Sequence, residues 1–356
     1  MNEVRATANI DDVLRRVLRA HAPLLVIAGM YVGACVLLTR IYKVETHLIY
    51  HSCRYLFAIA VLYVPTYGIH CVAFVRPHRP LSYIWCRVRS VSAEHIVSFF
   101  LVAAIIAVHM VAFMYIKPLI PVMHPFAWDA QFAHWDAALH GTDPWRLVHP
   151  YLAPTVVMRI VVTAYVFYFY AVFTAASWQA SRRNDSKVRM QFLLTFLLCW
   201  VLLGTVAATI FSSAGPCFYR HVVPGPDKYA ELMVYLQSPA TPASVIVQSQ
   251  KNLWYIYENH EYGHLFAISA MPSMHVALTF LLVLVSRSRV IRVLSIIFTI
   301  VVSLGCVHLA WHYAIDVYAG IIGAWLIWWI VGLCLRGRLP FSGWRTQDAA
   351  RPFNLR

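Results

Sequence analysis

Long apolar runs separated by short polar segments dominate the chain. Crossing the hydrocarbon core of a bilayer takes roughly 20 residues of helix, and the apolar runs approach that length repeatedly. The predicted spans cover residues 22–39, 55–75, 95–116, 155–178, 191–212, 274–286, 291–309 and 313–335. The sixth of these has the shortest apolar core and is long enough only if its helix begins near Pro272. The pattern therefore predicts an all-α fold, a polytopic transmembrane helical bundle of about eight spans.

Two longer stretches separate the spans, at residues 117–154 and 213–272. In the first, apolar and aromatic side chains share one helical face beside two acidic ones, as in a helix that rests on a bilayer surface. Its tryptophans suit anchors at the level of the lipid headgroups, and a lid over an active site is the alternative interpretation. The residues are Phe132, Trp135, Leu139, Asp129 and Asp136, with Trp128, Trp135 and Trp145 as anchors. The second stretch is rich in proline, so we expect a loop with one short helix.

Composition agrees with a membrane protein, since 60% of the 356 residues are hydrophobic and 12% are charged, against about half and a quarter in soluble proteins. A net charge of +14 would also suit nucleic-acid binding, but the placement of Lys and Arg argues against nucleic acid as a partner. Of the 29 basic residues, 20 fall in segments 1–21, 76–92, 181–190, 287–292 and after 335. This bias follows the positive-inside rule. It predicts that both termini are cytoplasmic and that residues 213–272 and the 310–314 turn share the outer face.

The same pattern divides the chain into five segments. We expect a cytoplasmic amphipathic N-terminus at 1–22, three N-terminal spans at 23–116, an outer-face interfacial helix segment at 117–154, a catalytic transmembrane bundle at 155–335 and a cytoplasmic tail at 336–356. The eight cysteines contain no C-x-x-C pair and are interpreted mostly as packing residues. Cys53 and Cys217 both face outward in this topology, so a disulfide between them is the alternative in an oxidising compartment.

The segment "CVHLAWHYAIDVYAG" carries three polar side chains four residues apart, His308, His312 and Asp316. If a helix starts near Trp311, His312 and Asp316 stand one turn apart, and the carboxylate can accept a hydrogen bond from one imidazole nitrogen. That contact would fix the tautomer and leave the other nitrogen free to act as nucleophile or base. A carboxylate at a membrane boundary is costly, so this pair favours a functional role over a structural one.

A metal site is the alternative for the same three residues. Two histidines at i and i+4 are a common zinc arrangement. However, His308 would belong to the preceding span if the helix breaks at the turn. The other ligands on offer are loop residues, namely His260, Glu261 and His264.

Two further segments on the predicted outer face carry candidate residues. In "MPSMHVALTF", Pro272 and Ser273 are typical of a helix start, which places His275 in the first turn, where free backbone N–H groups favour an anion. Ser273 would add a hydroxyl donor. In "FSSAGPCFYR", Arg220 follows the fifth span and suits a fork onto phosphate oxygens, with snorkelling to headgroups as the alternative. Lys228 is a weaker candidate of the same kind.

The motif "PSMH", followed 37 positions later by "HYAID", resembles the type 2 phosphatidic acid phosphatase superfamily. Its second and third motifs read P-S-G-H and S-R-x5-H-x3-D and precede the final two spans. Met274 and the H-Y-x-x-D pattern look most like the inositol phosphorylceramide synthase branch. The resemblance covers roughly residues 117–335 and implies a six-helix phosphatase or phosphotransferase core.

The chain departs from the family pattern at two motifs. The S-R of the third motif is Gly305-Cys306 here, and no K-x6-R-P first motif exists. At least one phosphate-binding arginine of the family is therefore missing. Arg220 lies where the first motif should fall and is assigned that role by position.

The resemblance implies chemistry without a metal or another cofactor. His312 would attack phosphorus, Asp316 would orient and stabilise it, and His275 would protonate the leaving oxygen. Arg220, Ser273 and Lys228 remain the candidate phosphate-binding residues. The expected substrate is a membrane phospholipid, sphingolipid or polyprenyl phosphate, with water or an alcohol headgroup as acceptor.

The short loops favour a bacterial inner membrane with the site facing the periplasm. Two other functions stay open. A transporter would use the intramembrane His and Asp as a proton relay, and a metal-dependent hydrolase would use the metal site described above.

Overall fold

The computed structural model describes residues 10–75, 77–182, 186–261 and 267–337. Within these ranges every regular element is a helix, which confirms the all-α prediction. Seven helical segments are long and apolar enough to cross a membrane, and they make this an integral membrane protein. They are α2 (Ala22–Ile41), α3 (Leu48–His70), α5 (Ala93–Ile116), α9 (Thr155–Ser181), α10 (Ser186–Leu198) with its continuation through η3 (Cys199–Ala207) and α11 (Ala208–Ile210), α16 (Arg289–His308) and α17 (Ala314–Leu335).

The predicted sixth span is a shorter helix than expected. Helix α15 (Met274–Val285) has 12 residues, which gives a length of roughly 18 Å, whereas the hydrocarbon core is about 30 Å thick. It begins at Met274 rather than near Pro272 because residues 267–273 form an irregular segment. Helices α9, α16 and α17 pack around α15. Non-helical backbone at membrane depth is tolerated where protein surrounds it.

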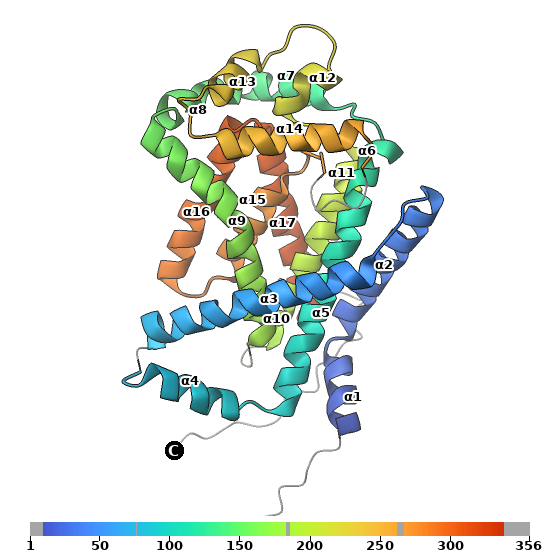
Figure 1. Ribbon diagram of the computed structural model, residues 1–356, viewed down its shortest axis with the longest axis vertical. Coiled ribbons are helices and arrows are strands. Elements are labelled where there is room, and N and C mark those ends of the chain that lie inside the picture. Colours follow the sequence, from blue (N-terminus) through green and yellow to red (C-terminus); the bar gives the residue numbers. More distant parts are fainter. Residues whose placement is uncertain (1–9, 76, 183–185, 262–266, 338–356) are drawn as a thin grey trace, which may run out of the picture.

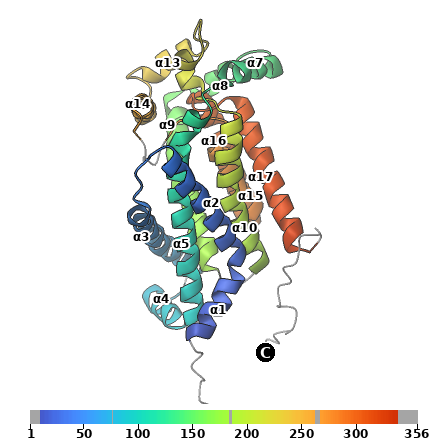
Figure 2. The same ribbon diagram turned by 90° about the vertical axis from the view of Figure 1, so that its right-hand side faces the viewer.

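Most of the long helices run side by side from one end of the molecule to the other (Figure 1). Helix α3 is the exception, since it crosses the bundle in Figure 1 and is seen nearly end-on in Figure 2. It coincides with the predicted span 55–75, together with η1 (Cys71–Val75). That segment is therefore helical but is not aligned with the other long helices.

Short helices cover one end of the bundle, which we call the outer end (Figure 1). Two segments of the chain supply them, residues 117–152 and 216–258. They are η2 (Lys117–Leu119), α6 (Ile120–Met123), α7 (Asp129–His140), α8 (Pro144–Leu152), η4 (Pro216–Phe218), α12 (Tyr219–Val222), α13 (Ala230–Gln237) and α14 (Ser244–Glu258). The turn between α16 and α17 reaches the same end. The two outer stretches and the 310–314 turn thus meet there.

Part of the predicted bilayer-facing side of residues 117–154 is instead buried in the protein. Phe132 and Trp145 are 0% and 5% exposed, whereas Trp135 and Leu139 are 40% and 66% exposed. Phe132 packs on Tyr313, with ring centroids 6.1 Å apart. Trp145 is therefore a core residue and not a headgroup anchor. Helix α7 has one face on the protein core and one face outward.

The opposite, inner end holds α1 (Ile10–Ala20) and α4 (Pro80–Arg89) (Figures 1 and 2). Helix α1 is amphipathic as predicted, and its Val13 and Val17 side chains are buried. It packs on α5 and continues in the direction of α2 rather than lying across the bundle. Cys53 and Cys217 are both free thiols, so the alternative disulfide between them is absent.

Candidate active site

His312 lies in the turn that joins α16 to α17. Ala310 has a left-handed backbone conformation, with φ of 58°. The backbone N–H groups of Trp311 and His312 both donate to the carbonyl oxygen of Cys306, each at 3.1 Å. Helix α17 then begins at Ala314, three residues later than the sequence pattern suggested. His312 consequently precedes the helix and does not share a helical face with Asp316.

A backbone carbonyl, not Asp316, accepts the hydrogen bond from the His312 ring. Nδ1 of His312 lies 2.8 Å from the oxygen of Ala270 and 3.5 Å from Oδ2 of Asp316. Because a carbonyl oxygen can only accept, the hydrogen is on Nδ1, and Nε2 carries a free lone pair. Asp316 uses Oδ2 to accept the backbone N–H of Tyr313 at 2.9 Å. The sequence predicted that a hydrogen bond fixes one tautomer of His312 but named Asp316 as the acceptor instead of the Ala270 carbonyl.

Burial keeps the His312 imidazole neutral. Its side chain is 7% exposed, and loss of hydration is the main reason that its pKa is lowered to about 3. The hydrogen bond to Ala270 raises the pKa, and the positive charge of Lys117 lowers it further. A neutral imidazole with a free Nε2 is the form that can attack an electrophile.

His275 is in the first turn of α15, as the sequence predicted, because Ser273 is the N-cap residue. Its ring centroid lies 5.6 Å from that of His312, and the two rings meet edge to face. Tyr165 and Tyr168 of α9 pack on His275 with centroid distances of 4.5 and 4.4 Å. The hydroxyl of Tyr165 is 3.5 Å from Nδ1 of His275. The structure therefore brings the two predicted histidines together and encloses one of them in aromatic rings.

Ser273 is fully buried and joins the start of α15 to α17. Its backbone N–H donates to the carbonyl oxygen of Asp316 at 3.0 Å. Its hydroxyl lies 3.6 Å from the sulfur of Cys306. A Cβ atom on Gly320 of α17 would stand 2.6 Å from the backbone carbonyl oxygen of Ser273. The Ser273 hydroxyl is thus paired with Cys306 in a hydrogen bond and is not the free donor that the sequence suggested.

Neither of the predicted cationic residues joins the histidines. Arg220 on α12 and Lys228 in the following loop are both exposed. Neither makes a hydrogen bond or ion pair with another described residue. Their positions at the outer end agree with the prediction, but the structure gives them no contact with the site.

Lys117 is a cation whose charge contributes to the lowered pKa of His312, and nothing in the sequence pattern selects it. It follows α5 in η2. Its Nζ atom is 5.9 Å from the Phe113 ring centroid. No carboxylate among the described residues forms an ion pair with it. In the sequence, a lysine just after a span looks the same as one that snorkels to headgroups.

His308 contacts a histidine of α8 and not the His275–His312 pair. Its Nε2 atom lies 3.0 Å from Nδ1 of His149 on α8, and its ring is fully buried. Across the part of the chain that the structure describes, no group of three His, Cys, Asp or Glu side chains is arranged to hold a metal. His264, a ligand in the metal alternative, lies outside the described residues.

Two buried aspartates of α7 also approach the site. Asp129 and Asp136 are each 2% exposed, and their carboxylates accept hydrogen bonds from Tyr313 and Ala314, which follow His312. The sequence pattern placed them on the helix but did not indicate that they point inward. Acidic residues beside an apolar face are equally typical of a helix at a bilayer surface.

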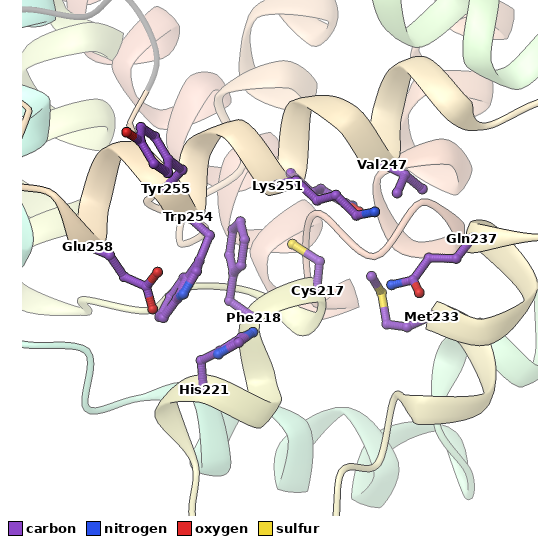
Figure 3. Close-up of a pocket in the computed structure, with 11 residues that line it drawn as sticks. Cys217, Phe218, His221, Met233, Gln237, Val247, Lys251, Trp254, Tyr255 and Glu258 are labelled. Atoms are coloured by element: carbon purple, nitrogen blue, oxygen red, sulfur yellow. The ribbon is translucent and has the colours of Figure 1, made fainter.

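A cavity of about 300 Å³ adjoins the His312 turn at the outer end, between α12, α13 and α14 (Figure 3). Cys217 lines it and donates its backbone N–H to Ala310 at 2.8 Å. Gln250 also lines it and donates to the carbonyl oxygen of Leu309 at 2.8 Å. The lining includes Gln237, Lys251, Trp254 and Glu258. The cavity thus lies against the residues that precede His312, and neither His275 nor His312 is part of its lining.

Seven long apolar helices with a buried histidine pair at one end indicate a membrane enzyme of phosphatase type. The profile of the PAP2 superfamily, the type 2 phosphatidic acid phosphatases, matches residues 130–330. This is more than half of the chain, and the protein belongs to that superfamily. The matched range contains His275, His312 and Asp316, whereas Lys117 and Asp129 precede it. No curated protein and no solved structure matches the chain.

Proposed function

We propose that the protein cleaves or transfers a phosphate or phospho-headgroup of a membrane lipid through a phosphohistidine at His312. The observation that carries the proposal is the pair of imidazoles, 5.6 Å apart by ring centroid, in which His312 has its hydrogen on Nδ1. One histidine can then attack while the other handles a proton. Two roles for two histidines are what a double-displacement reaction needs.

In the first step, Nε2 of His312 attacks phosphorus, and the bond from phosphorus to the leaving oxygen breaks. His275, protonated when the anionic phosphate is bound, donates its proton to that oxygen and becomes neutral. The phosphorylated imidazole keeps its hydrogen on Nδ1 and becomes positively charged. The Ala270 carbonyl at 2.8 Å and the Asp316 carboxylate at 3.5 Å stabilise that charge.

In the second step, His275 removes a proton from water or from an alcohol, whose oxygen then attacks phosphorus. The bond between phosphorus and Nε2 breaks, and His312 returns to its neutral form. We assign to Lys117 the role of stabilising the phosphoryl oxygens, because its positive charge contributes to the lowered pKa of His312 and no carboxylate among the described residues forms an ion pair with it. This assigns to Lys117 the role that the sequence suggested for Arg220 and Lys228.

A lipid is the substrate that best fits the position of the site at one end of an apolar bundle. A phospholipid, sphingolipid or polyprenyl phosphate would keep its chains in the bilayer while its phosphate reaches the outer end. A bacterial inner membrane with the site facing the periplasm fits the distribution of basic residues. The inositol phosphorylceramide synthase-like branch is supported by Met274 and by the H-Y-x-x-D motif.

Transfer to an alcohol is the second candidate reaction, and the cavity of about 300 Å³ favours it. Its lining offers both signs of charge through Lys251 and Glu258, which suits a neutral polar acceptor. The Oε1 atom of Gln250 has no hydrogen-bond partner among the described residues. A hydroxyl group of an acceptor would satisfy it.

The test is turnover of lipid substrates by the purified protein in detergent with EDTA. We expect activity that is lost in His312→Asn and His275→Asn but retained in His260→Asn. His260 is the matched control because it is exposed at the outer end and is a ligand in the metal alternative. Its φ of 53° suits asparagine. Turnover that requires added metal and is lost in His260→Asn would contradict the proposal, and proton-coupled transport without turnover would favour the transporter.

A further inference from the structure

Helix α7 buries two carboxylates against the rest of the protein. The proposed chemistry uses neither of them. Asp129 and Asp136 are two helical turns apart, so they share one face of α7. Each is 2% exposed, and no Lys or Arg among the described residues forms an ion pair with either. An ionised carboxylate is expensive to bury unless hydrogen-bond donors surround it. Backbone N–H groups are the main donors here.

Asp129 joins two loops of the outer end. Its carboxylate accepts the backbone N–H groups of Ala214 and Gly215, with shortest distances of 2.9 and 2.8 Å. It also accepts the hydroxyl of Tyr313 at 2.8 Å. Tyr313 is the residue after His312, so one carboxylate connects the 214–215 loop to the nucleophile's neighbour.

Asp136 holds the start of α17. Its two oxygens accept the backbone N–H groups of Ala314 at 2.7 Å and Ile315 at 2.9 Å. These are among the first N–H groups of the helix, which have no acceptor within the helix itself. Asp316 accepts a hydrogen bond from the backbone N–H of Tyr313. Three carboxylates therefore hold the three residues that follow His312.

The hydrogen bonds of Asp129 belong to a closed ring that includes His312. In the 213–215 loop, the carbonyl oxygen of Ser213 accepts a hydrogen bond from the backbone N–H of Ala270 at 2.9 Å. The hydroxyl of Ser213 accepts a second hydrogen bond, from the backbone N–H of Met271 at 3.2 Å. The Ala270 carbonyl accepts Nδ1 of His312, and the chain continues to Tyr313, which returns to Asp129. Asp129 therefore fixes the residue that follows His312, and through the 213–215 loop it also fixes the segment whose carbonyl sets the tautomer.

The N–H and O–H groups around Asp129 and Asp136 need both oxygens of each carboxylate to act as hydrogen-bond acceptors. Burial raises the pKa of the Asp129 and Asp136 carboxyl groups, and the backbone N–H groups that each accepts lower it. Every hydrogen bond at these oxygens, apart from those within α7, comes from an N–H or O–H of another segment. Asparagine in either place would turn an NH2 group toward a backbone N–H, which leaves both donors unpaired.

We propose that Asp129 and Asp136 are positioning residues that hold His312 in its reactive tautomer and place its Nε2 atom toward the phosphate. This inference rests on the proposed function for its catalytic consequence, but the tautomer itself is independent of it. Neither aspartate touches the reacting atoms. A displacement of about 1 Å at a catalytic group can cost roughly 10²-fold in rate.

The test compares Asp129→Asn and Asp136→Asn with Asp143→Asn. Asp143 is the matched control because it precedes α8 at the same end and contacts Arg146 at 3.7 Å instead of the His312 turn. We expect kcat to fall roughly 10²-fold in the two α7 variants, with KM little changed. The control should keep its kcat. Tyr313→Phe removes only the hydroxyl contact, so it should fold more readily and show a smaller loss of kcat.

The second readout is the tautomer of His312 from ¹⁵N NMR of histidine-labelled protein in micelles, assigned by the signal missing in His312→Asn. The wild type should show the hydrogen on Nδ1, and Asp129→Asn should show a mixture of tautomers. Unchanged kcat and an unchanged tautomer in folded variants would overturn the positioning role. If the wild type turns over no lipid phosphate, the proposed function fails, while the NMR comparison still decides the positioning role.

Discussion

The Nδ1 atom of His312 donates a hydrogen bond to the carbonyl oxygen of Ala270 at 2.8 Å. This contact crosses from the turn before α17 to the irregular segment before α15, so it ties together the two elements that carry the histidines. Asp316 lies farther away, at 3.5 Å from the same nitrogen. The backbone therefore sets the tautomer, and Asp316 contributes through its negative charge and through its hydrogen bond to Tyr313.

Asp316→Asn tests this division of roles. An asparagine oxygen can still accept the Tyr313 N–H, and Ala270 still holds the ring, so the tautomer should survive. Only the negative charge near the phosphorylated imidazole is lost. We expect kcat to fall roughly 10²- to 10³-fold, the usual cost of removing one electrostatic contact from a transition state. Steady-state kinetics would show this, and a wild-type kcat in this variant would contradict the role of the charge.

Lys117→Met should weaken catalysis far more than Arg220→Met. The charge of Lys117 contributes to the lowered pKa of His312, whereas Arg220 is exposed and contacts neither histidine. We expect kcat/KM to fall roughly 10²-fold or more in Lys117→Met and to change little in Arg220→Met. The two variants lose the same charge, so each controls for the other. The opposite order would return the phosphate-binding role to Arg220.

Gly320→Ala should loosen the contact between α17 and α15. The added Cβ would stand 2.6 Å from the backbone carbonyl oxygen of Ser273 and 3.4 Å from the backbone nitrogen of Ala277. Such overpacking typically costs about 1 to 3 kcal/mol, so the melting temperature in detergent should fall along with kcat. Gly33→Ala is the matched control, because nothing lies within 4 Å of its Cβ. Equal melting temperatures for the two variants would contradict this close approach.

Acid should destabilise the wild type more than His312→Gln. The pKa of His312 is lowered to about 3 in the folded protein, against about 6.5 in an unfolded chain. Below pH 6.5 the unfolded chain binds a proton that the folded one does not. Stability should therefore fall with pH down to the folded pKa, by up to about 1.4 kcal/mol per pH unit. Melting temperatures between pH 7 and 5 should drop more steeply in the wild type, and parallel curves would contradict the buried neutral imidazole.

The sequence predicted the parts of the site that depend on local pattern. Apolar runs gave the helices, and the proline and serine before Met274 gave the helix start that carries His275. The motif spacing paired His275 with His312, and the charge bias placed the outer stretches at one end. Each of these signals depends on residues close together in the chain or on a fixed spacing.

The contacts that the sequence did not predict join distant segments. The backbone acceptor for His312 lies 42 residues away, and a carbonyl has no signature in the sequence. The inward direction of Asp129 and Asp136 depends on how α7 packs, since either face of an amphipathic helix can meet the bilayer. Lys117 comes from a helix outside both motifs. Arg220 was selected by its position in the chain, which does not determine where its side chain points.

The central claim is that His312 becomes covalently phosphorylated without a metal. The most direct measurement is to incubate wild type and His312→Ala with lipids that carry labelled phosphate, in EDTA, and to quench for label on protein that is acid-labile and alkali-stable. We expect label on the wild type and none on His312→Ala. If neither protein takes up label while lipid phosphate turns over only after metal is restored, the phosphohistidine account is contradicted.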